Sequence, residues 1–184
     1  MSSDLADAAV APGPARPTNA PMRLTFLRHG KAVDRALWHE RDADRPLTAE
    51  GQDQLRELTR LLRPVVRTGL ICTSPWRRAR ETAEIFAAAW ELPLKECAWL
   101  AGEAAPPAQW VEELNPAVDT MLVGHEPDLG IAAAWLCGFG PSAGISSLPL
   151  KKAGVAILDG LPRPGGMQLM ALLPPKTVAA IAKA

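Results

Sequence analysis

The amino-acid sequence predicts an α/β fold: a single domain of three layers, α/β/α, built on a mostly parallel sheet. Short apolar runs with β-branched or aromatic residues alternate with longer segments whose apolar residues recur at helical spacing. This alternation is typical of parallel strands that are covered by helices on both faces. The 184 residues, of which 48% are hydrophobic, suffice for one sizeable core.

The first predicted strand is the apolar run at residues 22–27. It follows a proline-rich segment, residues 1–21, which we expect to be a disordered tail in front of one domain over residues 22–184. Beyond the strand, the highly charged residues 31–46 predict a long surface loop with one helical turn. Long loops of this kind commonly line functional sites.

The next three predicted elements are a helix, a strand and a helix. Thr48 is a typical N-cap residue, and the helix that follows it should end near Pro64. The apolar residues 69–73 predict the second strand. Ser74 and Pro75 then offer an N-cap and a first-turn proline for the second helix.

The second half of the chain continues the alternation with shorter elements. A turn rich in proline and glycine separates the last two strands. The predicted elements are a strand at 94–100, a short helix at 107–114, a strand at 120–123, a helix at 128–137, two strands at 154–158 and 167–172, and a helical turn at 177–184.

Composition excludes several classes of protein. The 20 basic and 20 acidic side chains balance, so the chain has no uniform basic field for nucleic acid or for a membrane surface. Its longest mostly apolar run, residues 129–139, is shorter than the ~20 residues that cross a membrane as a helix. The three cysteines lie far apart without CxxC spacing, which predicts buried thiols and a cytoplasmic protein: Cys72, Cys97 and Cys137.

Polar residues suited to phosphate chemistry follow three of the predicted strands. Arg28 and His29 follow the first strand, Arg77 and Arg78 open the helix after the second, and His125 follows the fourth. Ligands of such sheets bind at the carboxyl ends of the strands, so we expect these residues to meet at one edge. Guanidinium groups and a helix N-terminus suit phosphate, and a neutral imidazole can attack its phosphorus. The sequence therefore predicts a phosphate site that needs neither a metal ion nor a cofactor.

Four segments resemble the motifs of the histidine phosphatase superfamily, whose members have a phosphoglycerate-mutase-like α/β fold. Three of them match its RHG, S-P-x-x-R-A-x-x-T-A and VGHEP motifs: Arg28-His29-Gly30, residues 74–83 and residues 123–127. The remaining segment, residues 45–51, matches the R-P-L-T-x-x-G segment of the small SixA-type phosphohistidine phosphatases. Together the motifs span most of the chain after the proline-rich segment, and each has the expected strand or helix beside it.

The resemblance implies a role for each matching residue. His29 is the expected phosphoryl acceptor. Arg28, Arg78 and His125 are expected to hold the phosphoryl oxygens and to stabilise the transition state. Arg45 is expected to join them in binding the substrate. A backbone carbonyl should accept a hydrogen bond from the second ring nitrogen of His29 and so fix its tautomer.

The identity of a general acid stays open. Relatives that cleave phosphate esters protonate the leaving group with a carboxylic acid, and Glu103 is the nearest candidate by position, within reach of a bound substrate. Asp34, His39 and Asp44 in the charged loop are further candidates. A phosphohistidine substrate places a smaller demand on the acid, because the leaving imidazole resembles the nucleophile.

Three functions fit the sequence. The first is a phosphohistidine phosphatase that acts on a phosphorylated protein partner, the second is a phosphatase of a small phosphorylated metabolite, and the third is a phosphate-binding module without turnover. The short segments over the site, residues 31–46 and 100–114, predict an open site that suits a protein side chain. Phosphate-loop, dinucleotide and serine-hydrolase motifs are absent from the sequence.

Overall fold

The structure, a computed structural model, describes residues 21–101, 105–140 and 147–183. Its strands are β1 (Met22–Arg28), β2 (Leu70–Thr73), β3 (Leu94–Glu96), β4 (Thr120–Gly124), β5 (Val155–Gly160) and β6 (Met167–Leu173). They form one sheet in the order β3-β2-β4-β1-β5-β6. The first four strands in that order are parallel, whereas β5 is antiparallel to both β1 and β6. The predicted mostly parallel sheet is confirmed.

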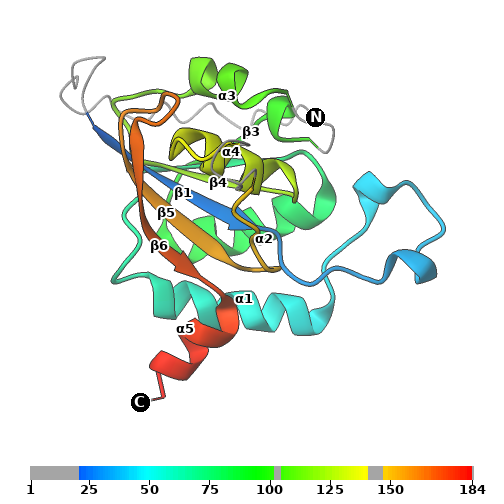
Figure 1. Cartoon of the computed structure of the whole chain (residues 1–184). Helices are drawn as coiled ribbons and strands as arrows, with labels where there is room; N and C mark the ends of the chain where they lie inside the picture. The colour runs from blue at the N-terminus through cyan, green and yellow to red at the C-terminus, as the bar shows by residue number, and fades with distance from the viewer. Residues whose placement is uncertain (1–20, 102–104, 141–146, 184) are drawn as a thin grey trace, which may run out of the picture.

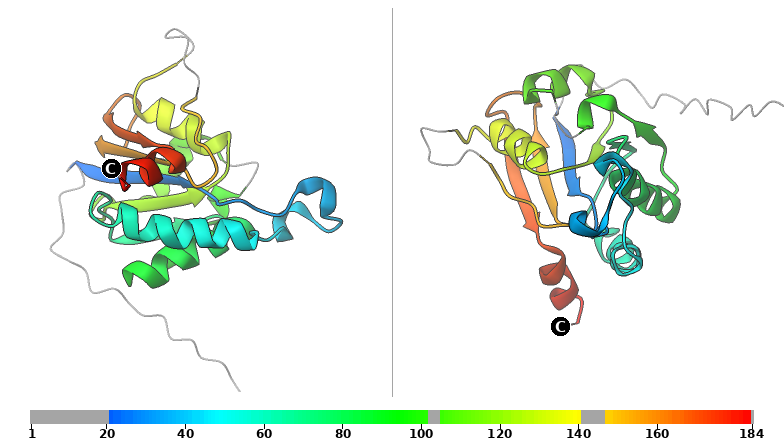
Figure 2. Two further views of the ribbon diagram at one scale, coloured as in Figure 1. Left: turned by 90° about the horizontal axis from the view of Figure 1, so that it is seen from below. Right: turned by 90° about the vertical axis from the view of Figure 1, so that its right-hand side faces the viewer.

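Helices cover both faces of this sheet (Figures 1 and 2). They are α1 (Ala49–Leu62), α2 (Arg77–Trp90), α3 (Pro107–Glu113), α4 (Asp128–Leu136) and α5 (Pro175–Ile181). In Figure 1, α1, α2 and α5 lie below the sheet, and α3 and α4 lie above it. The predicted three-layer architecture is therefore confirmed.

Alternate side chains of the central strand β1 fill two separate cores. Phe26 packs with Leu129 of α4 on one face of the sheet. Its neighbour Leu27 packs with Leu55 of α1 and Phe86 of α2 on the other face. Because successive side chains of a strand point to opposite faces, consecutive apolar residues such as Phe26 and Leu27 are what a sheet buried on both sides requires.

Several predicted boundaries differ from the structure. The second helix starts at Arg77 with Trp76 as its N-cap, so the expected cap at Ser74 is wrong. The strand expected at 94–100 ends at Glu96, because its neighbour β2 ends at Thr73 and offers nothing further to pair with. A short 3₁₀ turn, η3 (Ala98–Leu100), follows. The last helix begins two residues earlier than predicted, at Pro175.

The charged segment at residues 31–46 projects from the carboxyl end of β1 (Figure 2). It contains two 3₁₀ turns, η1 (Arg35–Leu37) and η2 (Asp42–Asp44), where one helical turn was expected. The tail expected over residues 1–21 lies outside the described residues except for Pro21.

The described residues contain no helix of the length and apolarity that a membrane span requires. All three cysteines are free. Cys72 and Cys97 are buried as predicted, but Cys137 is half-buried, so that part of the prediction is wrong.

Candidate active site

The three strand ends that carry the expected residues do meet at one edge of the sheet. The backbone N–H of His29 donates to Gly124 O over 3.1 Å, and that of Ser74 donates to Val123 O over 2.9 Å. These bonds continue the parallel ladders beyond the ends of β1 and β2. As a result the imidazole rings of His29 and His125 lie 5.2 Å apart, centroid to centroid.

His29 is held as a neutral imidazole with one nitrogen free to react. Its Nδ1 lies 2.8 Å from Gly30 O, and since a carbonyl only accepts, Nδ1 carries the proton. Its Nε2 accepts a hydrogen bond from Arg78 Nε over 3.2 Å and is therefore unprotonated. The pKa of His29 is lowered to about 3, chiefly by burial and also by the charges of His125, Arg78 and Arg28, against the opposing hydrogen bond to Gly30. The expected fixing of the tautomer by a carbonyl is confirmed.

Helix α2 holds the chain around His29 through a residue that the sequence analysis did not single out. The Thr82 hydroxyl donates to Arg78 O over 2.7 Å and accepts from the Gly30 N–H over 3.1 Å. Thr82 thus fixes the residue that follows His29 against the turn of α2 that carries Arg78. The sequence signal for it is its place as the threonine of the S-P-x-x-R-A-x-x-T-A segment, four residues after Arg78.

His125 is also buried and packs against an aromatic wall. Its Nε2 lies 2.9 Å from Ser74 Oγ, which also accepts from the Trp76 N–H. The centroid of the Trp76 ring lies 4.7 Å from that of the His125 ring, and the Arg78 guanidinium lies over the Trp76 ring, 4.5 Å from its centroid. Burial lowers the pKa of His125 to about 3, helped by the charge of Arg78. Ser74, expected to cap a helix, instead holds this histidine.

Arg28 is positioned through the Leu150 peptide group. Its Nη1 donates to Leu150 O over 2.8 Å, and Leu150 N donates to Glu126 Oε1 over 3.3 Å. Burial raises the pKa of Glu126. Two buried nitrogens at this edge have no hydrogen-bond partner among the described residues: Arg28 Nε and His125 Nδ1.

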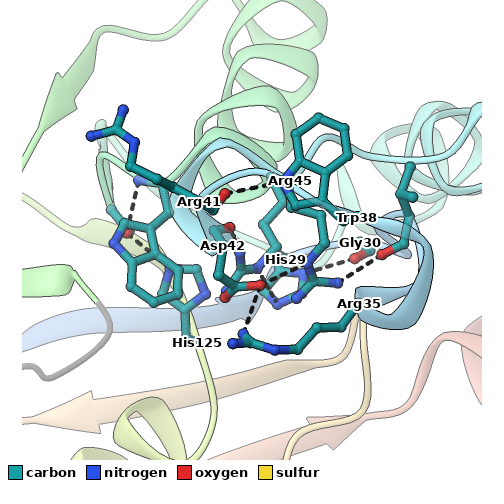
Figure 3. Close-up of polar contacts among 12 residues, drawn as sticks. His29, Gly30, Arg35, Trp38, Arg41, Asp42, Arg45 and His125 are labelled. Atoms are coloured by element: carbon teal, nitrogen blue, oxygen red, sulfur yellow. Dashed lines mark hydrogen bonds and ion pairs between the residues drawn. The ribbon is translucent and has the colours of Figure 1, made fainter.

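The loop over the site contributes an acidic residue that the sequence analysis missed, Asp42 (Figure 3). Its Oδ2 accepts from Arg78 Nη2 over 3.2 Å. Its Oδ1 lies 2.8 Å from Arg45 Nε and 3.0 Å from Arg35 Nη1. Burial by itself would raise the pKa of Asp42, but the hydrogen bond from Arg45 and the charge of Arg78 lower it below its ordinary value. The Asp42 carboxylate therefore forms ion pairs with three guanidinium groups that could otherwise bind an anion.

The loop that carries Asp42 is closed at its base. Thr48 N donates to Lys31 O over 2.9 Å, and Leu47 N donates to Glu81 Oε2 of α2 over 2.7 Å. A Cβ on Gly51 would overlap Lys31 O, so only glycine lets α1 approach the start of the loop. This close approach explains the glycine at the end of the R-P-L-T-x-x-G segment.

The expected substrate-binding residues have different outcomes. Arg45 lies at the site through Asp42, and its Nη1 also donates to Val33 O over 2.8 Å. Glu103 lies outside the described residues. The other three acid candidates have contacts elsewhere in the loop or with solvent: Asp34 caps η1, His39 is exposed, and Asp44 pairs with Arg41.

The described residues hold no group of three or more histidine, cysteine, aspartate or glutamate side chains with the geometry of a metal site. The arrangement that they do form is a neutral imidazole nitrogen, the buried guanidinium of Arg78 and a second imidazole. Such a set binds and polarises an oxyanion next to a nucleophile.

Comparison with known proteins points to the same chemistry. A sequence model of the histidine phosphatase superfamily (branch 1) matches residues 24–102. An uncharacterized protein of Picosynechococcus sp. is 42% identical over 143 residues, 73% of this chain and 82% of that protein.

Two solved structures illustrate the shared fold. The protein histidine phosphatase SixA complexed with tungstate has a TM-score of 0.72 at 23% identity, over 85% of this chain and 99% of that one. A mycobacterial glucosyl-3-phosphoglycerate phosphatase has a TM-score of 0.63 at 18% identity, over 84% of this chain and 100% of that one. Both likenesses are to the phosphoglycerate-mutase-like fold.

The fold, the motif matches and the imidazole site together define a phosphatase. The chain belongs to the histidine phosphatase superfamily, branch 1. Within that superfamily it resembles the small SixA-type proteins.

Proposed function

We propose that this phosphatase transfers the phosphoryl group of phosphohistidine on a protein partner to its own His29, and then to water, without a metal ion. Arg28, Arg78 and His125 hold the phosphoryl oxygens, and Arg45 contributes to substrate binding. The catalytic domain spans residues 22–184. Three free cysteines are in keeping with action in the reducing cytoplasm.

One observation carries this proposal: the unprotonated Nε2 of His29 lies among unsatisfied buried donors. Buried polar atoms are nearly always hydrogen-bonded, so the unpaired Arg28 Nε and His125 Nδ1 call for a ligand. If the Ser74 hydroxyl donates to His125 Nε2, the proton of that neutral ring is on Nδ1, and both orphan atoms are donors. Two donors next to a nucleophile match the oxygens of a phosphoryl group.

The transfer proceeds in two balanced steps. The lone pair of His29 Nε2 forms a bond to phosphorus while the bond from phosphorus to the leaving nitrogen breaks. The electron pair of that bond returns to the substrate's ring, which leaves as a neutral imidazole because its other nitrogen carries a proton. Arg78 Nε, which bonds to Nε2 in the free site, then faces a phosphoryl oxygen. Water next attacks phosphorus, the phosphorus to Nε2 bond breaks, and inorganic phosphate leaves with His29 neutral again.

The small demand that phosphohistidine places on a general acid favours it as the substrate. In the first step one imidazole replaces another, so a strong general acid is not needed. Of the candidates for that acid, Asp34 caps η1, His39 is exposed and Asp44 pairs with Arg41. The likeness to SixA, a protein histidine phosphatase solved with tungstate, supports the same assignment.

The test compares two substrates in the presence of EDTA: a histidine-phosphorylated phosphotransfer domain and p-nitrophenyl phosphate. We expect turnover of the phosphoprotein to exceed that of the ester. His29→Ala should lower the activity at least ~10⁴-fold, because the nucleophile is gone. The matched control is His39→Ala, which removes the exposed loop histidine and should keep the activity within about 2-fold.

Each result is decisive. Faster turnover of a small phosphate ester would favour the second candidate, a metabolite phosphatase. Activity that survives in His29→Ala, or disappears with EDTA, would overturn the mechanism. Binding of phosphate without turnover of either substrate would make the protein a binding module.

A further inference from the structure

A basic cavity of about 510 Å³ lies next to the candidate active site. Lys31, Arg35, Arg45 and Lys152 line it, together with the polar or small residues Ala32, Asp34 and Thr48. Its volume lies within the range of small-ligand pockets. The proposed chemistry at His29 uses neither Lys31 nor Lys152.

Three of the residues that line the cavity connect it to the site of His29. Lys31 follows His29 by two residues. The Ala153 N–H, directly after Lys152, donates to both Arg28 O and His29 O over 3.1 Å. Arg45 lines the cavity and also bonds to Asp42 at the active site. A ligand that extends from His29 therefore has this cavity as an immediate neighbour.

The charges in the cavity leave one cation without a counterion. Lys31 pairs with Glu50, and Arg35 and Arg45 share Asp42. Lys152 has no hydrogen bond or ion pair within the described part of the chain. With the carboxylate of Asp34 included, positive charge remains in excess, so the cavity favours an anion.

The geometry points to a second anion site in this cavity, which binds a carboxylate or phosphate group elsewhere on the substrate while the reacting phosphoryl group lies at His29. This inference rests on the proposed function, because it needs a phosphoryl group at His29. Two sources supply the chemistry: an acidic side chain close to phosphohistidine in a protein, or a second anionic group in a small metabolite. Lys152 is the residue that distinguishes such substrates from those with one anionic group.

Binding tests the site without any turnover. Calorimetry on the wild-type full chain would compare phosphonoacetate, 3-phosphonopropionate and 4-phosphonobutyrate with alkylphosphonates of equal length. We expect the carboxylate to tighten binding by about 5-fold at the chain length that spans the two sites, a typical size for one partly exposed ion pair. Lys152→Gln should abolish this advantage.

The matched control is Lys151→Gln, which removes the neighbouring exposed lysine outside the cavity lining and should keep the advantage. A carboxylate that gives no advantage at any length, or an advantage that survives in Lys152→Gln, overturns the inference. If the advantage is present but no substrate turns over, the second anion site stands and the proposed function fails. If a substrate turns over but the carboxylate gives no advantage in binding, the proposed function stands and the second anion site fails.

Two kinetic comparisons then identify the source of the second anion. One uses phosphohistidine peptides with Asp or Asn next to the phosphorylated residue, and the other uses a sugar bisphosphate and its monophosphate. Lys152→Gln should raise KM about 5-fold for the doubly charged member of one pair, relative to its partner. The pair that responds names the substrate class, and a ratio unchanged in both pairs overturns the inference.

Discussion

The two sides of the candidate active site are held together by different forces. The sheet-edge side (His29, Arg78 and His125) is at most 5% exposed and follows directly from strand ends and the start of α2. The loop side (Arg35, Asp42 and Arg45) is formed by ion pairs, and the Arg35 side chain is 75% exposed. The backbone hydrogen bonds of the strands fix the positions of the residues on the sheet-edge side. The ion pairs on the loop side can be broken by a charged ligand that binds the same side chains. We therefore expect substitutions on the sheet-edge side to affect the proposed chemistry most, and those on the loop side to affect the binding of anions.

The largest expected effect lies on the sheet-edge side. Arg78→Ala removes the buried guanidinium that bonds to His29 Nε2 and should lower kcat/KM by about 10³-fold, as the loss of a transition-state charge does. The matched control is Arg77→Ala, which removes the exposed neighbour that pairs with Glu81 and should cost less than 3-fold. Steady-state kinetics would check both, and equal losses would contradict the assignment to Arg78.

The sheet-edge side was also the part that the sequence could predict. Arg28 is the last residue of β1, and His29 and His125 directly follow β1 and β4, so the ends of neighbouring parallel strands bring them together. Asp42 could not be found in this way, because its place depends on the fold of a charged loop in which several acids look alike. Ser74 shows a different limit: its position suggested a helix cap, but its hydroxyl is occupied by His125 and by the Trp76 N–H.

The two buried histidines should make stability depend on pH. Burial lowers the pKa of both His29 and His125 from 6.5 to about 3. Above pH 6.5 neither state binds the protons, but below it the unfolded chain does and the folded protein does not, so the free energy of unfolding falls. Between pH 6.5 and pH 5 each histidine should lower the free energy of unfolding by on the order of 2 kcal/mol.

Urea unfolding at the two pH values, in phosphate-free buffer, would measure this loss. His125→Gln should reduce the loss by on the order of 2 kcal/mol, because one of the two sites no longer takes up a proton on unfolding. The control His39→Gln changes an exposed histidine of the loop and should leave the loss as in the wild type. A loss of equal size in all three proteins would show that other groups cause it.

A smaller effect is expected on the loop side. The Asp42 carboxylate pairs with the guanidinium groups of Arg35, Arg45 and Arg78, and the proposed function assigns Arg45 and Arg78 to the substrate as well. Asp42→Asn keeps the shape but removes the charge, so inorganic phosphate should inhibit about 10-fold more strongly, equivalent to about 1.4 kcal/mol. Competitive inhibition constants would check this. Weaker inhibition would mean that Asp42 orients the arginines and does not compete with the ligand.

The smallest effect is expected two residues further along the same 3₁₀ turn. Asp44 pairs only with the exposed Arg41 among the described residues, and the Arg41 side chain is 84% exposed. An exposed ion pair contributes at most about 1 kcal/mol, so Asp44→Asn should change kcat/KM and phosphate inhibition less than 2-fold. Measured beside Asp42→Asn under the same conditions, it separates a local contact at the site from a general change in the charge of the loop. Equal effects of the two variants would mean that the loop acts through its total charge, and that the contacts of Asp42 with three arginines have no particular role.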